Sequence, residues 1–463
     1  MRSLFKSIVV KILTWQATFL LKKNHPKIIA VTGNLGKTST KDLIYAALRK
    51  NLVSDKKDTL VLASKKSMNS DFGIPLTILG LESGWTNPIL WIKVIFNGFV
   101  KMLDHFPYKY LILEIGADSP GDIQKVCKYI KPDIVVLTAF AEVPVHIEFF
   151  GNDREKLVRE KKYLVENLKE EGLFIYNLDD EDCVKIAAEM QSRNIEIKSF
   201  SLKNENAEIY TKNIQILSED ISKNINKIRG IYGEIFMDNR EKLEIEIYGS
   251  IGEVVFYSLL PALLIAKYFG LDLEKVVQDI ERSKKTKGRM RVLEGVYNST
   301  IIDDTYNSSP KALRHGIETM KKLETKGKKI FVLGDMLELG DFTRSEHEAI
   351  GRILPGICDI LVTSGIRAKF IAESAEESGM KKENIFATSN SLEAARQTLL
   401  ILENEVEKDF GKGKTEKEVG GDLIFVKGSQ GARMEKVVHM ILNKEIHNPE
   451  EELVRQEKAW SYK

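Results

Sequence analysis

The stretch Lys27–Thr40, KIIAVTGNLGKTST, decides the fold. Its apolar first half predicts a buried strand, and Gly33 and Gly36 bound a short loop that leads into a helix beginning near Lys37. Glycines let backbone N–H groups turn onto phosphate oxygens, and the helix directs its positive end at the same anion. The order of strand, glycine loop, Lys-Thr and helix therefore predicts a phosphate-binding loop.

The loop assigns roles to single side chains. We expect Lys37 to reach the β- and γ-phosphates of a nucleotide and the Thr38 hydroxyl to hold Mg²⁺. Two residues separate Gly33 from Gly36, and Val31 stands where the common pattern has a further glycine, so the loop is a short variant. The residues expected to contact ATP here are Gly33, Asn34, Gly36, Lys37, Thr38 and Ser39.

The composition is that of an ordinary globular protein. The chain has 463 residues, which suggests two or three domains, with 43% hydrophobic and 29% charged residues. A net charge of +2 gives no general attraction to nucleic acid, so we expect no such partner. Cys127, Cys183 and Cys358 lack metal or redox spacing and fit a reducing cytoplasm. We expect a monomer.

Residues 2–23 form a basic segment. They contain no acid, they carry one arginine and four lysines, and their periodicity predicts a helix. Lys6 and Lys11 inside the run argue against a membrane-spanning segment. Two interpretations stay open. We favour a helix docked on its own domain, and the alternative is a basic amphipathic helix that lies on an anionic membrane surface.

Apolar, β-rich runs alternate with helical patterns along the chain. They are KIIAVTG, TLVLAS, YLILEIGA, DIVVLTAF and LFIYNLDD, followed later by STIIDDTY, KIFVLGDM, DILVTSG and DLIFVKGS. Runs buried on both faces and separated by helices predict parallel α/β sheets. Residues 201–249 alternate more and predict a small antiparallel segment, 252–282 reads as helix-rich, and 404–421 predicts an exposed loop.

Two further polar side chains follow predicted strands. Glu114 ends the run YLILEIGA, where a carboxylate beside a phosphate loop is a natural Mg²⁺ ligand. His146 lies in AEVPVHIEFFG after the next strand, where a metal or phosphate ligand is expected. The alternatives are a solvated surface acid and a structural histidine.

Seven separated motifs resemble the Mur ligase family in order and spacing. They are TGNLGKTST, Asn69 with Gly73-Ile74-Pro75, EIGADSPGDI, HIEFFG, DDTYNSSP, LGDMLELG and VKGSQGARME. The resemblance runs from about residue 26 to about residue 445, and its last three motifs are most similar to members that join D-alanyl-D-alanine to UDP-N-acetylmuramoyl-tripeptide. It implies an ATP-dependent peptide ligase of peptidoglycan precursor synthesis that uses ATP, Mg²⁺, a UDP-muramoyl-peptide and D-Ala-D-Ala.

The resemblance also implies an organisation and a mechanism. A basic helix (1–26) would precede a central P-loop ATP-binding α/β domain with a parallel sheet (27–285) and a C-terminal Rossmann-like α/β ligase domain (286–463). A peptide carboxylate would attack the γ-phosphate of ATP to give an acyl phosphate, which the amine of the second substrate then attacks. The C-terminal domain would close to bring in the amine and exclude water.

Single positions receive roles from the same resemblance. Lys161 falls where the family carries a carbamylated lysine, with Lys162 as the neighbouring alternative. The implied metal ligands are Thr38, Glu114, His146 and Lys161, and the implied catalytic residues are Lys37, Lys161 and His146. Arg289, Asp303, Asp304, Tyr306 and Asn307 would meet the nucleotide. The implied substrate-binding residues are Asn69, Asp335, Glu338, Lys427, Ser429 and Arg433.

The sequence departs from the family where substrates are recognised. The family's UDP-binding N-terminal domain would precede the first strand, where this sequence has 26 residues, too few for a folded domain. Val254-Val255 replaces an expected His-Asn-like pair, Lys287 an expected proline, Gln430 an arginine and Ala139 an asparagine. Two other interpretations therefore stay open: a Mur-like ligase for a different carboxylate, for example a lipid-linked one, and a non-catalytic nucleotide-binding partner.

Overall fold

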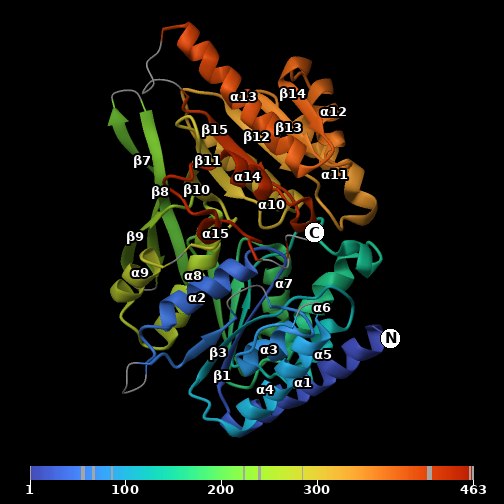
Figure 1. Ribbon diagram of the computed structural model, residues 1–463. Helices are drawn as coiled ribbons and strands as arrows, with labels where there is room; N and C mark the ends of the chain where they lie inside the picture. Colours follow the sequence, from blue (N-terminus) through green and yellow to red (C-terminus); the bar gives the residue numbers. More distant parts are fainter. Residues whose placement is uncertain are drawn as a thin grey trace.

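The protein folds into two β-sheets with helices on both faces of each, and Figure 1 shows the second sheet above the first. The computed structural model describes residues 2–53, 58–64, 68–84, 87–222, 225–237, 241–283, 285–413, 420–457 and 460. The parallel α/β architecture expected from the sequence is confirmed.

The first sheet has nine strands in the order β2-β3-β1-β4-β5-β6-β7-β8-β9. Their bounds are β1 (Lys27–Thr32), β2 (Val61–Ala63), β3 (Tyr110–Glu114), β4 (Ile134–Leu137), β5 (Leu173–Asn177), β6 (Glu196–Ser201), β7 (Ile209–Ser222), β8 (Ile225–Met237) and β9 (Lys242–Tyr248). Pairing is parallel from β2 to β7 and antiparallel from β7 to β9. The antiparallel segment predicted over 201–249 thus extends the main sheet.

Strand β1 shows why these strands read as unbroken apolar runs. Ile28 and Ala30 belong to one buried core, and Ile29 and Val31 belong to the core on the opposite face. Both faces are covered by helices, so the four positions 28–31 are all apolar. One layer comprises α1 (Arg2–Asn24), α3 (Gly73–Leu79), α4 (Pro88–Leu103), α5 (Asp122–Cys127), α6 (Arg154–Glu166) and α7 (Glu181–Met190). The other layer comprises α2 (Lys37–Leu48), α8 (Val254–Tyr268) and α9 (Leu273–Glu281).

The second sheet has six strands in the order β10-β11-β15-β12-β13-β14, with β10 antiparallel at one edge. Their bounds are β10 (Arg291–Glu294), β11 (Thr300–Asp304), β12 (Lys329–Gly334), β13 (Ile360–Ser364), β14 (Ile385–Thr388) and β15 (Leu423–Lys427). One face packs on α10 (Pro310–Lys322), α11 (Thr343–Arg352) and α12 (Lys369–Glu377), and the other on α13 (Ser391–Gly411) and α14 (Glu435–Ile441). The short α15 (Pro449–Glu452) follows α14.

The two halves share an apolar contact. Val143, Ile147 and Ile251, from the first half, belong to the same core cluster as Ile302 of β11 and Met336 after β12. The loops that follow β4 and β12 therefore meet between the two sheets.

Helix α1 docks on the first half, as favoured from its sequence. Leu13, Ala17 and Leu20 are buried in the core, and the Gln16 amide donates to the Ile95 carbonyl oxygen of α4 at 3.0 Å. In the described part of the chain, no helix combines the length and apolar content needed to cross a bilayer.

The prediction of an exposed loop over 404–421 is wrong in its first part. Helix α13 begins after Asn390, whose side chain caps it, and continues to Gly411. Residues 404–410 contain Glu and Lys, which favour helix, and no proline, so the helix continues through them. Residues 414–419 of that prediction lie outside the described residues.

Candidate active site

The glycine loop after β1 has the geometry of an anion cradle. Gly33 and Gly36 have φ values of 138° and 79°, in the region that favours glycine. A Cβ on Gly33 would lie 2.1 Å from the Thr138 hydroxyl oxygen, so a larger residue does not fit. The loop delivers the chain directly to the N-terminus of α2 at Lys37, where backbone N–H groups and the helix dipole favour an anion.

The Lys37 ammonium folds back over this loop. Its Nζ donates to the carbonyl oxygens of Gly33 at 2.9 Å and Asn34 at 3.3 Å. Burial disfavours the charged form and lowers the pKa of Lys37, while the nearby Glu114 carboxylate opposes that effect. A phosphate group would give this partly buried cation the anionic partner that the two carbonyls replace only in part.

A cavity of about 200 Å³ opens beside the loop. The loop and α2 supply Gly36, Ser39 and Thr40, and apolar residues of the α8 region, such as Ile251 and Val255, supply one wall. The second half contributes Arg289, Asp304, Lys311, His315 and Lys427. The cavity is therefore lined by both halves of the molecule, with cations on the side opposite the phosphate loop.

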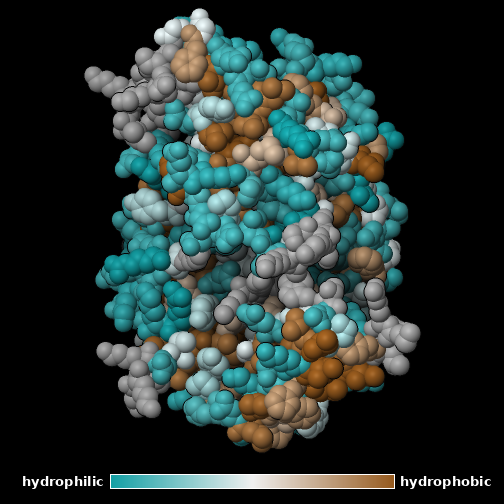
Figure 2. All heavy atoms as spheres, viewed as in Figure 1, coloured by the Kyte–Doolittle hydropathy of each residue, from teal (hydrophilic) through white to brown (hydrophobic). Residues whose placement is uncertain are grey.

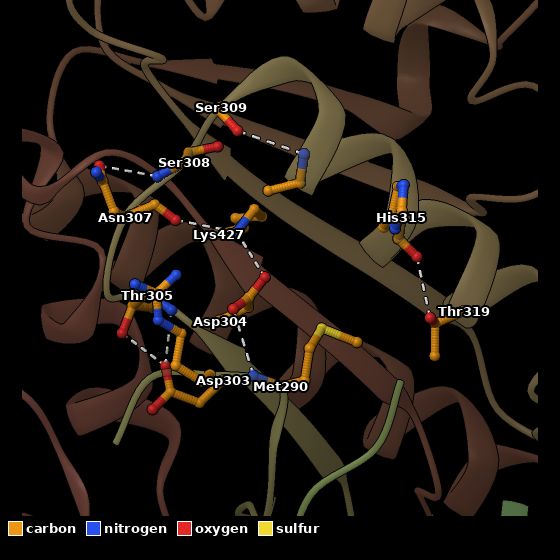
Figure 3. Close-up of polar contacts among 12 residues, drawn as sticks. Met290, Asp303, Asp304, Thr305, Asn307, Ser308, Ser309, His315, Thr319 and Lys427 are labelled. Atoms are coloured by element: carbon orange, nitrogen blue, oxygen red, sulfur yellow. Dashed lines mark hydrogen bonds and ion pairs between the residues drawn. The ribbon is translucent and has the colours of Figure 1, made fainter. Parts of the chain in front are cut away.

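Lys427 and Asp304 form the centre of the second half's contribution (Figure 3). Lys427 Nζ donates to Asp304 Oδ2 at 2.5 Å and to the Asn307 carbonyl oxygen at 3.0 Å. Both side chains are buried, and burial lowers the pKa of Lys427 while Asp304 opposes that effect. The Asp304 carboxylate also accepts from the Met290 backbone N–H. This pair fixes the ends of β15 and β11 on the cavity.

Asp303 is turned away from the cavity. Its Oδ1 accepts from the Thr305 N–H at 3.1 Å and the Thr305 hydroxyl at 2.6 Å. Burial raises the pKa of Asp303 to about 6. Of the two acids expected at the nucleotide, Asp304 lines the cavity and Asp303 braces the turn behind it.

Glu114 and Lys161 approach the loop from the other side. Glu114 is buried at the end of β3, and its Oε1 accepts from the Asn69 amide at 3.1 Å. Lys161 is buried on α6, and its pKa falls to about 7, first through burial and then through the positive charge of Lys37. Two lysines brought together in a buried site are destabilising unless an anion separates them.

His146 joins the two halves of the molecule. Its Nδ1 lies 2.8 Å from Glu338 Oε2, and its Nε2 lies 3.5 Å from Asp118 Oδ1. The backbone N–H of His146, which has a φ of 73°, donates to the Glu338 carbonyl oxygen at 3.1 Å. The contact with His146 lowers the pKa of Glu338. Glu338, expected on the side of the incoming amino acid, thus faces the expected metal ligand His146.

Four other expected site residues make contacts away from the cavity. Asp335 accepts from the Ala368 N–H at 2.7 Å, and Ser429 accepts from the Leu337 N–H at 2.9 Å. Arg433 donates to Glu435 at 2.6 Å and lies over the ring of Trp460, 5.3 Å from its centroid. Asn307 Oδ1 accepts from two backbone N–H groups, those of Ser308 and Gln430. In this structure these side chains position loops.

Several functional candidates were missed from the sequence. Asp118 acts electrostatically on both Lys37 and Lys161, although only its motif, EIGADSPGDI, had been recognised. Asn177 and Asp179 line the cavity at the end of the run LFIYNLDD, whose acidic end was a usable signal. Tyr257 donates to Asp179 at 3.0 Å from α8, and nothing in the local sequence indicates that contact.

The C-terminal segment holds the turn that follows β11. The Arg289 guanidinium lies 4.3 Å from the ring centroid of Tyr306. Arg455, about 150 residues later in the chain, donates to the carbonyl oxygens of Thr305 at 2.5 Å and Tyr306 at 3.0 Å. It also contacts Glu435 at 2.8 Å. The turn after β11 is therefore held by the last described part of the chain.

A second cavity, of about 1200 Å³, runs along α2. Thr38, Asp42, Tyr45 and Arg49 lie along one side, at the spacing of one helix face. The opposite side comprises Lys285, Lys287, Tyr306, Gln430, Glu450 and residues 453–457 with Trp460. The cavity begins at the phosphate loop and extends outward, so it can hold a long substrate whose reacting end lies near Thr38.

The described residues include no group of three or more His, Cys, Asp or Glu side chains placed to hold a metal ion. Thr38 and Glu114 supply a hydroxyl and a carboxylate beside the phosphate loop, which are suitable oxygen ligands for Mg²⁺. A complete set of ligands would need phosphate oxygens, water or a modified Lys161.

Known proteins share this arrangement. Residues 96–252 match the Mur ligase middle domain, and residues 288–430 match the Mur ligase, glutamate ligase domain. The UDP-N-acetylmuramoyl-tripeptide--D-alanyl-D-alanine ligase of Bacillus subtilis is 27% identical over 413 residues, which cover 89% of this chain and 75% of that protein. The enzyme of the same name from Escherichia coli K12 is 24% identical over 417 residues, covering 90% and 76%.

A solved structure shows the same fold. The crystal structure of the MurF ligase from Thermotoga maritima in complex with ADP superposes with a TM-score of 0.69 at 24% identity, covering 93% of this chain and 83% of that one.

Proposed function

The chain belongs to the Mur ligase family, as its motifs predicted, and we propose that it adds D-alanyl-D-alanine to a UDP-N-acetylmuramoyl-tripeptide in peptidoglycan precursor synthesis. Members of this family are ATP-dependent ligases that form amide bonds. The observation that carries the proposal is the cavity lined by both halves, in which the phosphate loop faces Arg289, Asp304 and Lys427.

The residues present fit a nucleotide. Buried polar atoms of the loop region, Asn34 Oδ1 and Thr40 Oγ1, make no hydrogen bond within the protein, and neither does Arg289 Nε. Such atoms cost free energy unless a ligand or water satisfies them. Ile251, Val254 and Val255 offer an apolar wall for the base, in place of the polar pair that the family pattern predicts.

We propose that the acceptor carboxylate attacks the γ-phosphorus of ATP, which releases ADP and leaves an acyl phosphate. The amine of the dipeptide then attacks the acyl carbon, and inorganic phosphate leaves. Lys37 would balance the charge that spreads over the phosphate oxygens. His146 and Glu338, one from each half, would hold the halves together while the acyl phosphate exists, which excludes water.

Magnesium would be held by the Thr38 hydroxyl and the Glu114 carboxylate, with His146 and Lys161 at a second position. When bound, Mg²⁺ neutralises charge on the transferred phosphoryl group. The buried carboxylate of Glu114 beside the loop supports this assignment.

We further propose that Lys161 carries a carbamate. The neutral amine attacks CO₂, a C–N bond forms and a proton is lost, so a buried cation becomes an anion. Lys161 is buried next to Lys37, where an anion relieves the repulsion between the two ammonium groups. Lys162, the alternative, is instead paired with Glu166 and Glu189 on the surface.

The second cavity is the proposed place of the acceptor. Its near end lies at Thr38, and Arg49 lies roughly 16 Å farther along α2, at 1.5 Å per residue. Arg49, Lys285 and Lys287 give it cations suited to a substrate with phosphate or carboxylate groups.

We propose a division near residue 285 into a central ATP-binding unit and a C-terminal ligase unit, supported by the separation of the two sheets between β9 and β10. The cysteines are unpaired thiols, which supports a cytoplasmic location. We propose a monomer with peripheral membrane contact through residues 2–23, where exposed Phe5, Trp15 and Phe19 support the contact.

Phosphate release from ATP and Mg²⁺ tests the function. The purified protein receives UDP-N-acetylmuramoyl-tripeptide and D-Ala-D-Ala together, or with either omitted. Release that requires both substrates, with pentapeptide product, is the expected result. ATP turnover without either substrate would favour another acceptor, such as a lipid-linked carboxylate. No turnover under any condition would favour a non-catalytic nucleotide-binding partner.

A further inference from the structure

Helices α1 and α4 together expose an unusual amount of apolar surface. Eleven of the 23 large apolar side chains that are exposed in the described residues lie on these two helices. We call this surface the α1–α4 face, and its apolar members are Phe5, Ile8, Trp15, Phe19, Ile89, Leu90, Ile92, Phe96, Phe99, Val100 and Leu103. Figure 2 shows apolar side chains gathered along the lower edge of the molecule, where Figure 1 places these helices.

Helix α4 contributes most of this surface. The sequence had indicated only residues 2–23, which form α1. Ile92, Phe96 and Leu103 are 65%, 66% and 86% exposed, and they recur at the spacing of one helix face. The opposite face of α4 is buried through Trp91 and Met102. The exposed residues are therefore not needed to attach the helix, and a soluble surface gains nothing from them.

The two helices form one rigid surface. The Trp15 and Phe99 rings lie 6.0 Å apart, and Lys23 Nζ donates to the Met102 carbonyl oxygen at 3.1 Å. Gly98 of α4 allows the close approach, because a Cβ there would lie 2.1 Å from Gln16 Oε1. The exposed residues of both helices are thus presented side by side.

The charge of this face selects its partner. Neither helix contains an acidic residue, and the described lysine side chains on them are Lys6, Lys11, Lys22, Lys23, Lys93 and Lys101. Lysine is depleted in the cores of protein–protein interfaces, whereas lysines around Trp and Phe are typical of surfaces that insert between lipid headgroups. An anionic bilayer attracts each lysine, and the apolar side chains then enter the boundary of the acyl chains.

We propose that the α1–α4 face binds the surface of an anionic lipid bilayer, with α4 as the main inserting element and α1 beside it. This binding is independent of the ligase reaction, because none of these side chains lines either cavity.

Flotation of the full chain with vesicles tests the proposal. Vesicles of phosphatidylcholine with phosphatidylglycerol should carry the protein, and vesicles of phosphatidylcholine alone should carry far less. Ile92→Glu and Leu103→Glu should each weaken binding roughly tenfold or more. Ile366→Glu is the matched control, because Ile366 is 78% exposed on the other half of the molecule. This variant should bind vesicles as the wild type does. Lys93→Gln should weaken binding to anionic vesicles roughly fivefold and leave binding to neutral vesicles unchanged.

Two further measurements separate the alternatives. Trp15 emission should shift to the blue with anionic vesicles, and Trp15→Phe should remove that part of the shift. The proposal is overturned if the wild type does not float with anionic vesicles, or if Ile92→Glu floats equally well. It is also overturned if the wild type sediments as a dimer that Ile92→Glu dissociates, since the face would then bind a second copy. Adenine-nucleotide binding should be the same in all these variants.

Discussion

The imidazole of His146 lies 2.8 Å from the carboxylate of Glu338, and this contact joins a loop after β4 to a loop after β12. A second bond, from the His146 N–H to the Glu338 carbonyl oxygen, fixes the same two residues through the backbone. The pair spans the two halves whose approach the proposed reaction needs. Both side chains are partly exposed, so their value lies in positioning more than in stability.

Glu338→Ala should therefore reduce catalysis much more than stability. We expect kcat for phosphate release to fall roughly tenfold or more, since the halves lose a contact that aligns the reacting groups. The midpoint of chemical unfolding should change little, because the ion pair is partly solvated. Arg344→Ala, in the same half of the molecule but in an exposed pair with Glu348, is the control and should keep full activity. Equal activity of Glu338→Ala and the control would contradict the role.

Lys37→Met should separate stability from activity. The wild-type ammonium is partly buried, near the fully buried lysine Lys161. Removing one cation relieves the repulsion, so the free energy of unfolding should stay the same or rise. Phosphate release should fall at least about a thousandfold, because the γ-phosphate loses its cation. A stable variant that still turns over ATP with both substrates would show that Lys37 does not act on the phosphate.

Activity should depend on dissolved CO₂ through Lys161. Stripping CO₂ from the buffer should lower the rate, and bicarbonate should restore it within the same sample. Lys161→Ala should be slow and insensitive to bicarbonate, whereas Lys162→Ala should respond as the wild type does. Intact-mass measurement under gentle conditions should find about 44 Da of added mass (CO₂) on the wild type. A fully active protein with an unmodified Lys161 would rule out the carbamate.

Asp303 should make stability fall as the pH rises. Burial raises its pKa in the folded protein to about 6, above the ordinary value of 3.8, so the folded state binds the proton more tightly than the unfolded chain. The wild type therefore loses stability between about pH 4 and about pH 6. Asp303→Asn does not titrate and keeps the acceptor for Thr305. Its free energy of unfolding relative to that of the wild type should therefore increase across this window, by about 3 kcal/mol at most. Urea unfolding of both proteins at several pH values measures the difference, and a constant difference would contradict it.

The phosphate loop and the long strands were predictable because their signals are local. Residues 27–40 carry the buried run, the two glycines and the Lys-Thr pair in one stretch, and the structure has β1, the loop and α2 in that order. Strands β10 and β14 were missed, since each has four residues and few buried positions that could set a period.

Side-chain partners were much less predictable. Arg433 was expected at the substrate, yet it contacts Glu435 and Trp460, and the second of these lies in a tail that no sequence pattern connects to the site. Asp118 lies near Lys37 only because β3 pairs with β1, which brings the loop after β3 to Lys37. Such partners depend on contacts between distant segments, which residue types and spacing do not encode.

The contact of Arg455 with the turn after β11 has a consequence for biosynthesis. A ribosome releases Thr305 and Tyr306 long before it releases Arg455, which holds their two carbonyl groups in the finished protein. The turn after β11 can therefore take its final shape only after Arg455 has been synthesised, so a nascent or clipped chain that stops before Arg455 should fold its two sheets and still bind nucleotide poorly.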